Sequence, residues 1–412
     1  MLEVSASARL WGLNGGVLVM CFLVSGLANV IPQFVLLQLA PEHKAFWLPL
    51  CLLAGTLGAI VGTLLGGAVW ERWLSSRWVL LPLIGTGLGV WGLFHSRDPR
   101  LFVAIAAAVN GLGNLLITRF DHLATRAAGD ERRPFNDRLG TACRLLGMLL
   151  APWFFTHHLQ NAPAVSAVIV ASLVGALTAW LATFRKAQGR LEAGRAAAAD
   201  RVRLGAVDLL VLGHAVTVYA SLYLFSANIS YFLRDALGIK QATPRAGVLI
   251  VTVFLMALVA VALGGRLLRR AGHDGAVGPG YLALAPVLPL LVALVAYEGH
   301  AAFTFRGLVA IAATLGVGYG CFLLGLRDHV SRSVRLGKGL MLTVYNNLAN
   351  VSALLAFVGM LALVRLVPGS SEAYYHAWMR LVATVSLSGI PLMLLARRRL
   401  APDSLLPGGS RP

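Results

Sequence analysis

The most constraining feature of this chain is a long apolar stretch that recurs twelve times between short polar breaks. A helix needs about 20 consecutive apolar residues to cross the roughly 30 Å hydrocarbon core of a bilayer. Lipid offers no hydrogen bonds, so a spanning segment of this length must satisfy its backbone internally, as a helix does. We therefore expect an all-α membrane protein with helices over residues 12–39, 45–70, 78–94, 101–122, 138–159, 163–184, 206–233, 246–265, 276–297, 307–326, 339–366 and 376–396.

The Lys and Arg residues are distributed unevenly between the polar breaks. If the N-terminus is cytoplasmic, 26 of the 35 fall in or beside the cytoplasmic breaks and nine fall on the outer side. The positive-inside rule predicts this orientation, with both termini in the cytoplasm. The net charge is +18, but the cations cluster at helix ends on one side. We interpret them as topology signals and lipid-headgroup contacts, and expect no nucleic-acid partner.

The cysteines indicate neither a disulfide framework nor a zinc site. Cys21, Cys51, Cys143 and Cys321 are widely separated and fall within apolar stretches, without any CxxC pair or Cys/His cluster. Each is expected to be a small buried side chain. We expect no metal and no cofactor.

The break between the sixth and seventh stretches divides the chain into two halves. We expect a six-helix half over 1–184, a cytoplasmic linker over 185–205, a second six-helix half over 206–396 and a cytoplasmic tail over 397–412. Six helices per half preserve the in/out sense, so the halves are expected to be parallel repeats. Three matched segments support this: Ala28-Asn29-Val30 with Ala227-Asn228-Ile229, Gly66-Gly67 with Gly264-Gly265, and Arg119/Asp121/His122 with Arg327/Asp328/His329. Residues 125–137 and 234–245 are the longest breaks within the halves.

The break after the second stretch carries a distinctive motif. Gly67 is followed four and five positions later by Glu71 and Arg72, and then by Arg77. This motif and the two halves resemble the major facilitator superfamily of secondary transporters, over essentially the whole chain. Two positions depart from the pattern, because Leu74 stands where the family often has Gly and Glu71 replaces the usual Asp. The resemblance implies alternating access, with these four matching residues forming a latch on the cytoplasmic side. The alternative is plain positive-inside flanking.

The resemblance also bears on direction and substrate. Gly140, Gly147 and Ala151-Pro152 look like a degraded form of the family's exporter motif. We expect a monomeric transporter in the cell inner membrane that exports a small polar, amphiphilic or anionic molecule, drug-like or siderophore-like. Uptake and lipid translocation remain alternatives within the same fold. An integral-membrane enzyme is disfavoured, because the outer breaks are short and the acid-rich break has no partnering nucleophile.

Polar side chains inside the apolar stretches are candidate substrate contacts. Such groups are costly in lipid and by default face the bundle interior. In the family, helices one, four, seven and ten line the central cavity, and we expect Asn29 and Asn228 to face each other across it. The alternative is hydrogen bonding between helices. The candidate cavity residues are Asn29, Gln33, Asn110, Asn114, Tyr223, Asn228, Tyr231, Asn346 and Asn350.

The charges inside the stretches are candidates for gating. Arg144 lies one to two turns into the fifth stretch, and Asp121, at the end of the fourth, is its expected partner. The two residues form either a structural ion pair or a gate, and Arg144 can alternatively bind an anion. Arg327 and Asp328 take the matching place in the second half and join the gating set. No carboxylate lies near the middle of a stretch, so a co-transported proton remains open.

Overall fold

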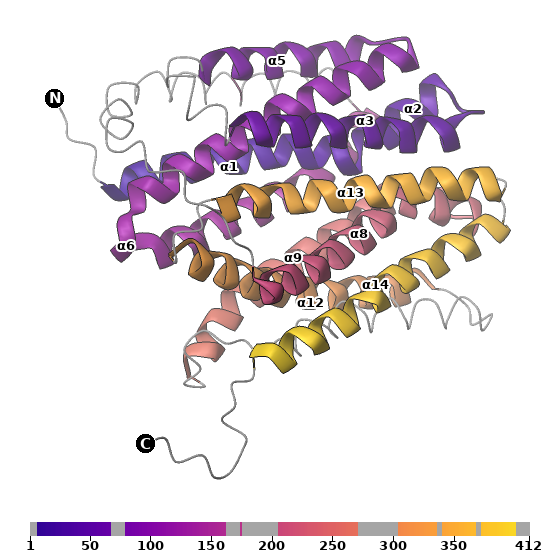
Figure 1. Cartoon of the computed structure of the whole chain (residues 1–412). Helices are drawn as coiled ribbons and strands as arrows, with labels where there is room; N and C mark the ends of the chain where they lie inside the picture. The colour runs from indigo at the N-terminus through magenta and orange to yellow at the C-terminus, as the bar shows by residue number, and fades with distance from the viewer. Residues whose placement is uncertain are drawn as a thin grey trace, which may run out of the picture.

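The computed structural model describes residues 6–66, 79–161, 174, 205–270, 304–335, 340–367 and 372–400. These residues form helices joined by short connections (Figure 1). The ten helices are α1 (Ala6–Asn29), α2 (Ile31–Leu39), α3 (Lys44–Leu64), α5 (Leu80–His95), α6 (Pro99–Asn161), α8 (Ala206–Asp235), α9 (Ala242–Arg270), α12 (Phe305–Arg335), α13 (Leu340–Leu366) and α14 (Glu372–Leu400).

The described residues contain nine segments long and apolar enough to cross a membrane, and α5 is a shorter apolar helix. Together they account for ten of the twelve expected helices. The other two, 163–184 and 276–297, lie outside the described residues except for Val174, as do the linker and the tail. The count of twelve and the boundaries of the halves therefore stay predictions.

The first apolar stretch is two helices rather than the single helix expected over 12–39. The chain leaves helical geometry at Val30, where φ is −127° and ψ is −55°, and α2 begins with Pro32 in its first turn. Proline has no backbone N–H, and its ring collides with the carbonyl group four residues earlier. Pro32 therefore interrupts the helix just before its own position.

The expected polar break at 125–137 is wrong in its secondary structure, because α6 is helical throughout its 63 residues. The run nevertheless reverses direction, as Figure 1 shows. Asp121 and Arg144 would be about 35 Å apart along a straight helix, yet their side chains are 3.0 Å apart. The polarity of the segment suggested a loop, but its Ala, Glu and Arg residues are good helix formers.

The connection between α8 and α9 is also shorter than expected. The expected loop at 234–245 reduces to residues 236–241, because α8 continues to Asp235 and α9 begins at Ala242. Gly238 has a φ of +64°, which a glycine adopts without steric cost.

Close helix packing holds each half together. A methyl group at Gly62 of α3 would overlap the backbone oxygen of Gly111 in α6, so the two backbones are in contact. In the second half, Gly320 of α12 meets the backbone oxygen of Ala257 in α9 in the same way. Small residues allow such approaches between membrane helices. The two helices of the α3–α6 pair and the two of the α9–α12 pair thus approach each other in the same way.

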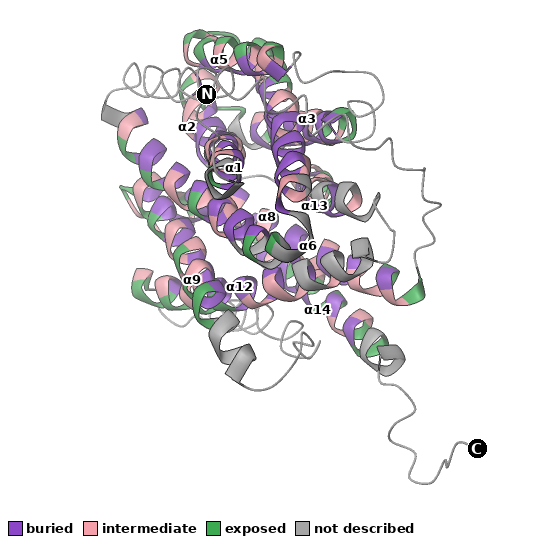
Figure 2. Cartoon of the chain, turned by 90° about the vertical axis from the view of Figure 1, so that its left-hand side faces the viewer, coloured by how far each residue is buried: buried purple, intermediate pink, exposed green. Residues whose placement is uncertain are grey.

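The outer surface of the bundle is apolar. Buried positions point inward and exposed positions outward (Figure 2). The exposed side chains include Leu88, Trp153 and Leu355, each more than half exposed. Soluble proteins rarely expose extended apolar surface, whereas lipid covers it without cost.

Candidate functional site

A cavity of about 140 Å³ lies between the two halves. Side chains of α1 and α6 line it from the first half, and side chains of α8, α9, α12 and α13 line it from the second. The lining is predominantly apolar. Its polar side chains are Ser25, Asn114, Thr118 and Arg144 from the first half and Tyr219, Tyr223, Ser226, Tyr319 and Asn350 from the second.

Three of the nine candidate cavity residues line this space: Asn114, Tyr223 and Asn350. Asn29 and Asn346 belong to α1 and α13, but their side chains lie outside the described part of the structure. Gln33, Asn110, Asn228 and Tyr231 lie elsewhere in the bundle.

Asn110 and Asn114 share a face of α6, as their spacing predicts, but they have different surroundings. The Asn114 side chain donates to the Asn110 backbone oxygen at 3.0 Å and lines the cavity. The Asn110 side chain packs over Gly55 of α3. Only Asn114 is placed to meet a substrate.

Asn228 does not face the cavity, contrary to the expectation for the matched asparagines. It is 3% exposed, and its side-chain nitrogen donates to the Tyr374 hydroxyl of α14 at 2.6 Å. The residue therefore fastens α8 to α14 within the second half, which is the interhelical alternative.

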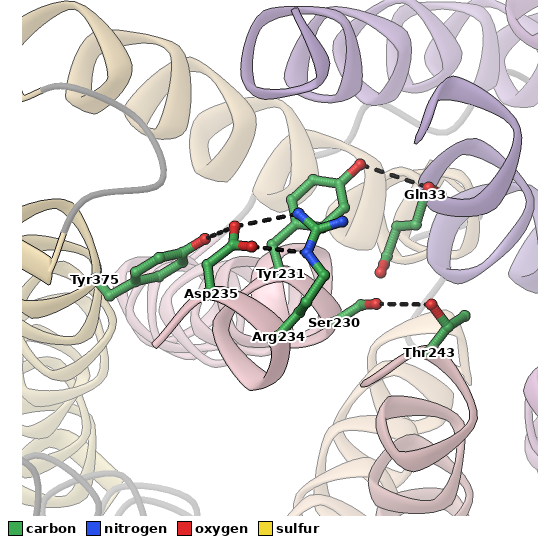
Figure 3. Close-up of polar contacts among 7 residues, drawn as sticks. All are labelled: Gln33, Ser230, Tyr231, Arg234, Asp235, Thr243 and Tyr375. Atoms are coloured by element: carbon green, nitrogen blue, oxygen red, sulfur yellow. Dashed lines mark hydrogen bonds and ion pairs between the residues drawn. The ribbon is translucent and has the colours of Figure 1, made fainter. Parts of the chain in front are cut away.

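Gln33 of α2 and Tyr231, near the C-terminal end of α8, join the two halves (Figure 3). The Tyr231 hydroxyl donates to the Gln33 backbone oxygen at 3.5 Å, and the Gln33 side chain donates to the Ser226 backbone oxygen at 3.4 Å. The Arg234 guanidinium lies 5.4 Å from the centre of the Tyr231 ring. These contacts lie toward the C-terminal end of α8, which the charge distribution predicts to be external.

The same network continues into the second half. Asp235 pairs with Arg234 at 2.7 Å and accepts a hydrogen bond from the Tyr375 hydroxyl of α14 at 2.8 Å. Ser230 and Thr243 share a hydrogen bond of 3.2 Å between α8 and α9. Figure 3 shows these side chains around the end of α8.

Arg144 and Asp121 form the expected pair. Arg144 Nη2 lies 3.0 Å from Asp121 Oδ2, and the carboxylate is almost completely buried. The guanidinium also lies 5.9 Å from the centre of the Tyr345 ring, which belongs to α13 of the other half. Arg144 thus touches the cavity, the carboxylate and the opposite half at once.

The remaining latch and gating residues cannot be placed in detail. Gly67, Glu71, Arg72 and Arg77 lie outside the described residues. Arg327 and Asp328 belong to α12, but their side chains lie outside the described part. The latch stays a prediction.

A histidine–aspartate contact at the start of α8 was missed by the sequence reasoning. His329 Nε2 of α12 lies 2.9 Å from Asp208 Oδ1, and Asp208 Oδ2 accepts the backbone N–H of Gly205 at 2.9 Å. His329 matches His122 of the first half, and that match was the available signal. The pair ties the first helix of the second half to the fourth.

Sequence reasoning predicted Tyr223 as a cavity residue but missed its aromatic neighbours Tyr319 and Phe254. The Tyr219 and Tyr319 rings lie 6.1 Å apart at 80°, and Tyr319 lies 6.3 Å from Phe254. All three line the cavity from the second half. Aromatic residues are common in apolar helices, so their shared direction was invisible before the helices were packed.

The described residues contain no group of three or more His, Cys, Asp or Glu side chains placed to hold a metal ion. The site is therefore built from one cation, its buried counter-charge, amides and phenols.

The fold can be compared with solved structures. A crystal structure of a single-residue variant of the nucleoside transporter NupG aligns with 95% of this chain and 100% of its own, with a TM-score of 0.65 at 13% sequence identity. NupG is a major facilitator superfamily protein. The chain has the major facilitator fold. No protein-family model matches the sequence, and no curated protein matches it. Because the identity is so low, the likeness extends to the major facilitator fold and not to the cargo.

Proposed function

We propose that this chain is a secondary transporter that moves a small molecule across a membrane by alternating access. The main support for this proposal is the cavity between the halves, which is lined by side chains from both. A site shared by two rigid halves opens to one side or the other when the halves rock around it. The apolar surface of the bundle agrees with a membrane location.

The size of the cavity favours a small cargo. A single water needs about 10–15 Å³ in a comparable measure, so about 140 Å³ admits a molecule on the order of ten non-hydrogen atoms. A drug-like fragment or a metabolite fits this space better than a siderophore. Nucleosides belong in a substrate screen, because NupG carries them on this fold.

Both directions of transport stay within the proposal. The degraded exporter motif in α6 favours export, and the NupG fold agrees equally with uptake. The charge distribution supports placing both termini inside. The inner-membrane location and the monomeric state are carried over from the family resemblance.

A reversible cross-link between the halves tests alternating access. Thr156 of α6 packs against Gly247 of α9, and a Cβ atom on Gly247 would lie 3.2 Å from the Thr156 Cβ atom. Disulfides need Cβ atoms about 3.5–4.5 Å apart. In a chain without its four natural cysteines, the pair Thr156→Cys with Gly247→Cys should stop substrate counterflow in proteoliposomes on oxidation and recover it on reduction.

The matched control stays within one half. Ser230→Cys with Thr243→Cys joins α8 to α9, whose side chains are 3.2 Å apart. Oxidation of this pair should leave counterflow largely intact, because both helices move together. Full flux through the cross-linked Thr156/Gly247 protein would refute rocking of the halves.

A further inference from the structure

The cavity is electrically neutral where the structure describes it. Arg144 is the only formally charged side chain among the described lining residues, and Asp121 lies 3.0 Å from it. Asp121 is 1% exposed, so water reaches the pair mainly through the partly exposed Arg144 side chain. Taking an additional ion out of water costs several kcal/mol even after relaxation. A charged cargo meets no spare counter-charge here, whereas a neutral cargo leaves the pair intact.

One side of the cavity favours a flat molecule. Tyr219, Tyr223, Tyr319 and Phe254 line it, all from the second half. The Tyr219 and Tyr319 rings are buried and pack against each other and against Phe322. Tyr223 and Phe254 are only half-buried, so their rings are the ones with surface left for a cargo. Aromatic rings pack well against one another in offset or edge-to-face arrangements. A planar ring therefore suits this side better than a flexible chain.

Two amides, one from each half, supply hydrogen bonds. One N–H of Asn114 is used by the Asn110 backbone oxygen at 3.0 Å, and one N–H of Asn350 by the Thr63 hydroxyl at 3.3 Å. Neither amide oxygen has a hydrogen-bond partner among the described residues, and neither is enclosed by protein. Each amide can still accept one hydrogen bond and donate another.

We propose that the cargo is a small, flat, uncharged molecule with amide or hydroxyl groups, held between Asn114 and Asn350 with its ring against the tyrosines. This deepens the transporter function above and rests on it. The cargo is inferred to be uncharged because Arg144 is already paired with Asp121. It is inferred to be flat because one side of the cavity is aromatic. It needs hydrogen-bond donors because the two amide oxygens are available as acceptors. Because the amides come from opposite halves, one such molecule bridges both.

Three probes of similar size and different charge test the class: benzamide, benzoate and benzylamine, the last protonated at pH 7. A ligand that binds only the folded protein raises its melting temperature. Benzamide at millimolar concentration should raise it, and the two ions should not. Stronger stabilisation by benzoate or benzylamine would overturn neutrality, and no stabilisation by any of the three would overturn the class.

Substitutions distinguish the contribution of the two amides to cargo binding from that of the Arg144–Asp121 pair. Asn114→Leu and Asn350→Leu should each weaken apparent benzamide affinity about tenfold, the loss of one or two hydrogen bonds. Asn347→Leu is the control, because Asn347 is buried on the same helix as Asn350 but does not line the cavity. Asp121→Asn should leave Arg144 without its counter-charge and reverse the preference toward benzoate. Unchanged preference in Asp121→Asn would contradict the neutrality argument.

Counterflow of radiolabelled benzamide in proteoliposomes distinguishes this inference from the transporter function. Stabilisation without flux would leave the cargo class standing and count against transport. Counterflow of benzoate alone would keep transport and refute the class.

Discussion

At the scale of single residues, the Arg144–Asp121 pair decides the chemistry of the cavity. Each partner alone would be a charge in a medium of low dielectric constant, and such charges are stable there only when paired. The pair also reaches the opposite half, since Arg144 lies over the Tyr345 ring. Cation–π contacts gain strength as water is excluded. Any movement of the halves must therefore change the surroundings of the guanidinium.

Removing only one partner of the Arg144–Asp121 pair should destabilise the folded protein more than removing both partners. Arg144→Ala leaves the Asp121 carboxylate buried, at a cost of about 3–5 kcal/mol, whereas Arg144→Ala with Asp121→Ala should recover most of the lost stability. Melting temperatures of purified wild type, single and double variants measure this. Recovery of both stability and transport in the double variant would make the pair purely structural. Recovery of stability alone would assign it a part in binding or gating. A single variant as stable as the wild type would refute the buried pair.

At the scale of helices, backbone contact at small residues sets how tightly the elements of each half pack. Gly62 against Gly111 and Gly320 against Ala257 leave no room for a side chain. Without a hydrophobic driving force between helices in lipid, this packing carries much of the association.

Filling the closest contact should loosen the first half. Gly62→Ala places a methyl group on the Gly111 backbone, and overpacking of this kind costs about 1–3 kcal/mol. The matched control is Gly15→Ala in α1, where an added Cβ atom meets nothing within 4 Å. Thermal unfolding in detergent should show a lower melting temperature for Gly62→Ala only. Equal melting temperatures would mean that α3 and α6 do not approach as closely as described.

The junction of α2 with α8 should act as the external closure. Tyr231→Phe removes the hydroxyl that bonds to Gln33, while the ring under Arg234 remains. We expect faster labelling of Ala349→Cys, at a partly exposed cavity position, by an external thiol reagent when the four natural cysteines are replaced by alanine. Tyr375→Phe is the control, since its hydrogen bond to Asp235 stays within the second half. Similar labelling rates in both variants would exclude a closure at Tyr231.

At the scale of the whole molecule, orientation in the membrane follows from charge rather than from packing. The bundle itself is compatible with either orientation, whereas the uneven distribution of Lys and Arg is not.

Labelling single cysteines from outside tests the orientation. Lys240 in the α8–α9 turn and Arg132 in the reversing part of α6 are both exposed. In intact cells, an impermeant maleimide should modify Lys240→Cys and not Arg132→Cys, with both modified after lysis. Ala242, in the same external region, is unsuitable because it is 5% exposed. Modification of Arg132→Cys alone in intact cells would invert the assigned topology.

The sequence by itself determined the all-helical membrane character, the approximate positions of ten apolar segments, and the partnership of Arg144 with Asp121. The length of an apolar segment and the presence of a charge within it are local properties of the sequence. In lipid these properties strongly constrain the structure, so they predict it without knowledge of tertiary contacts. The break at Val30, just before Pro32, was not expected from the sequence.

Only the tertiary structure decided which polar side chains reach the cavity. Asn114 and Asn228 look alike in sequence, yet one lines the cavity and the other bonds to Tyr374. The difference depends on helix rotation, which is set by neighbouring helices and by contacts such as Gly62 with Gly111. The reversal between residues 122 and 138 was predicted from the sequence, but the continuous helical geometry of α6 through it was not. Helical periodicity assigns a residue to a face of its own helix, and the packing of the bundle decides what that face meets.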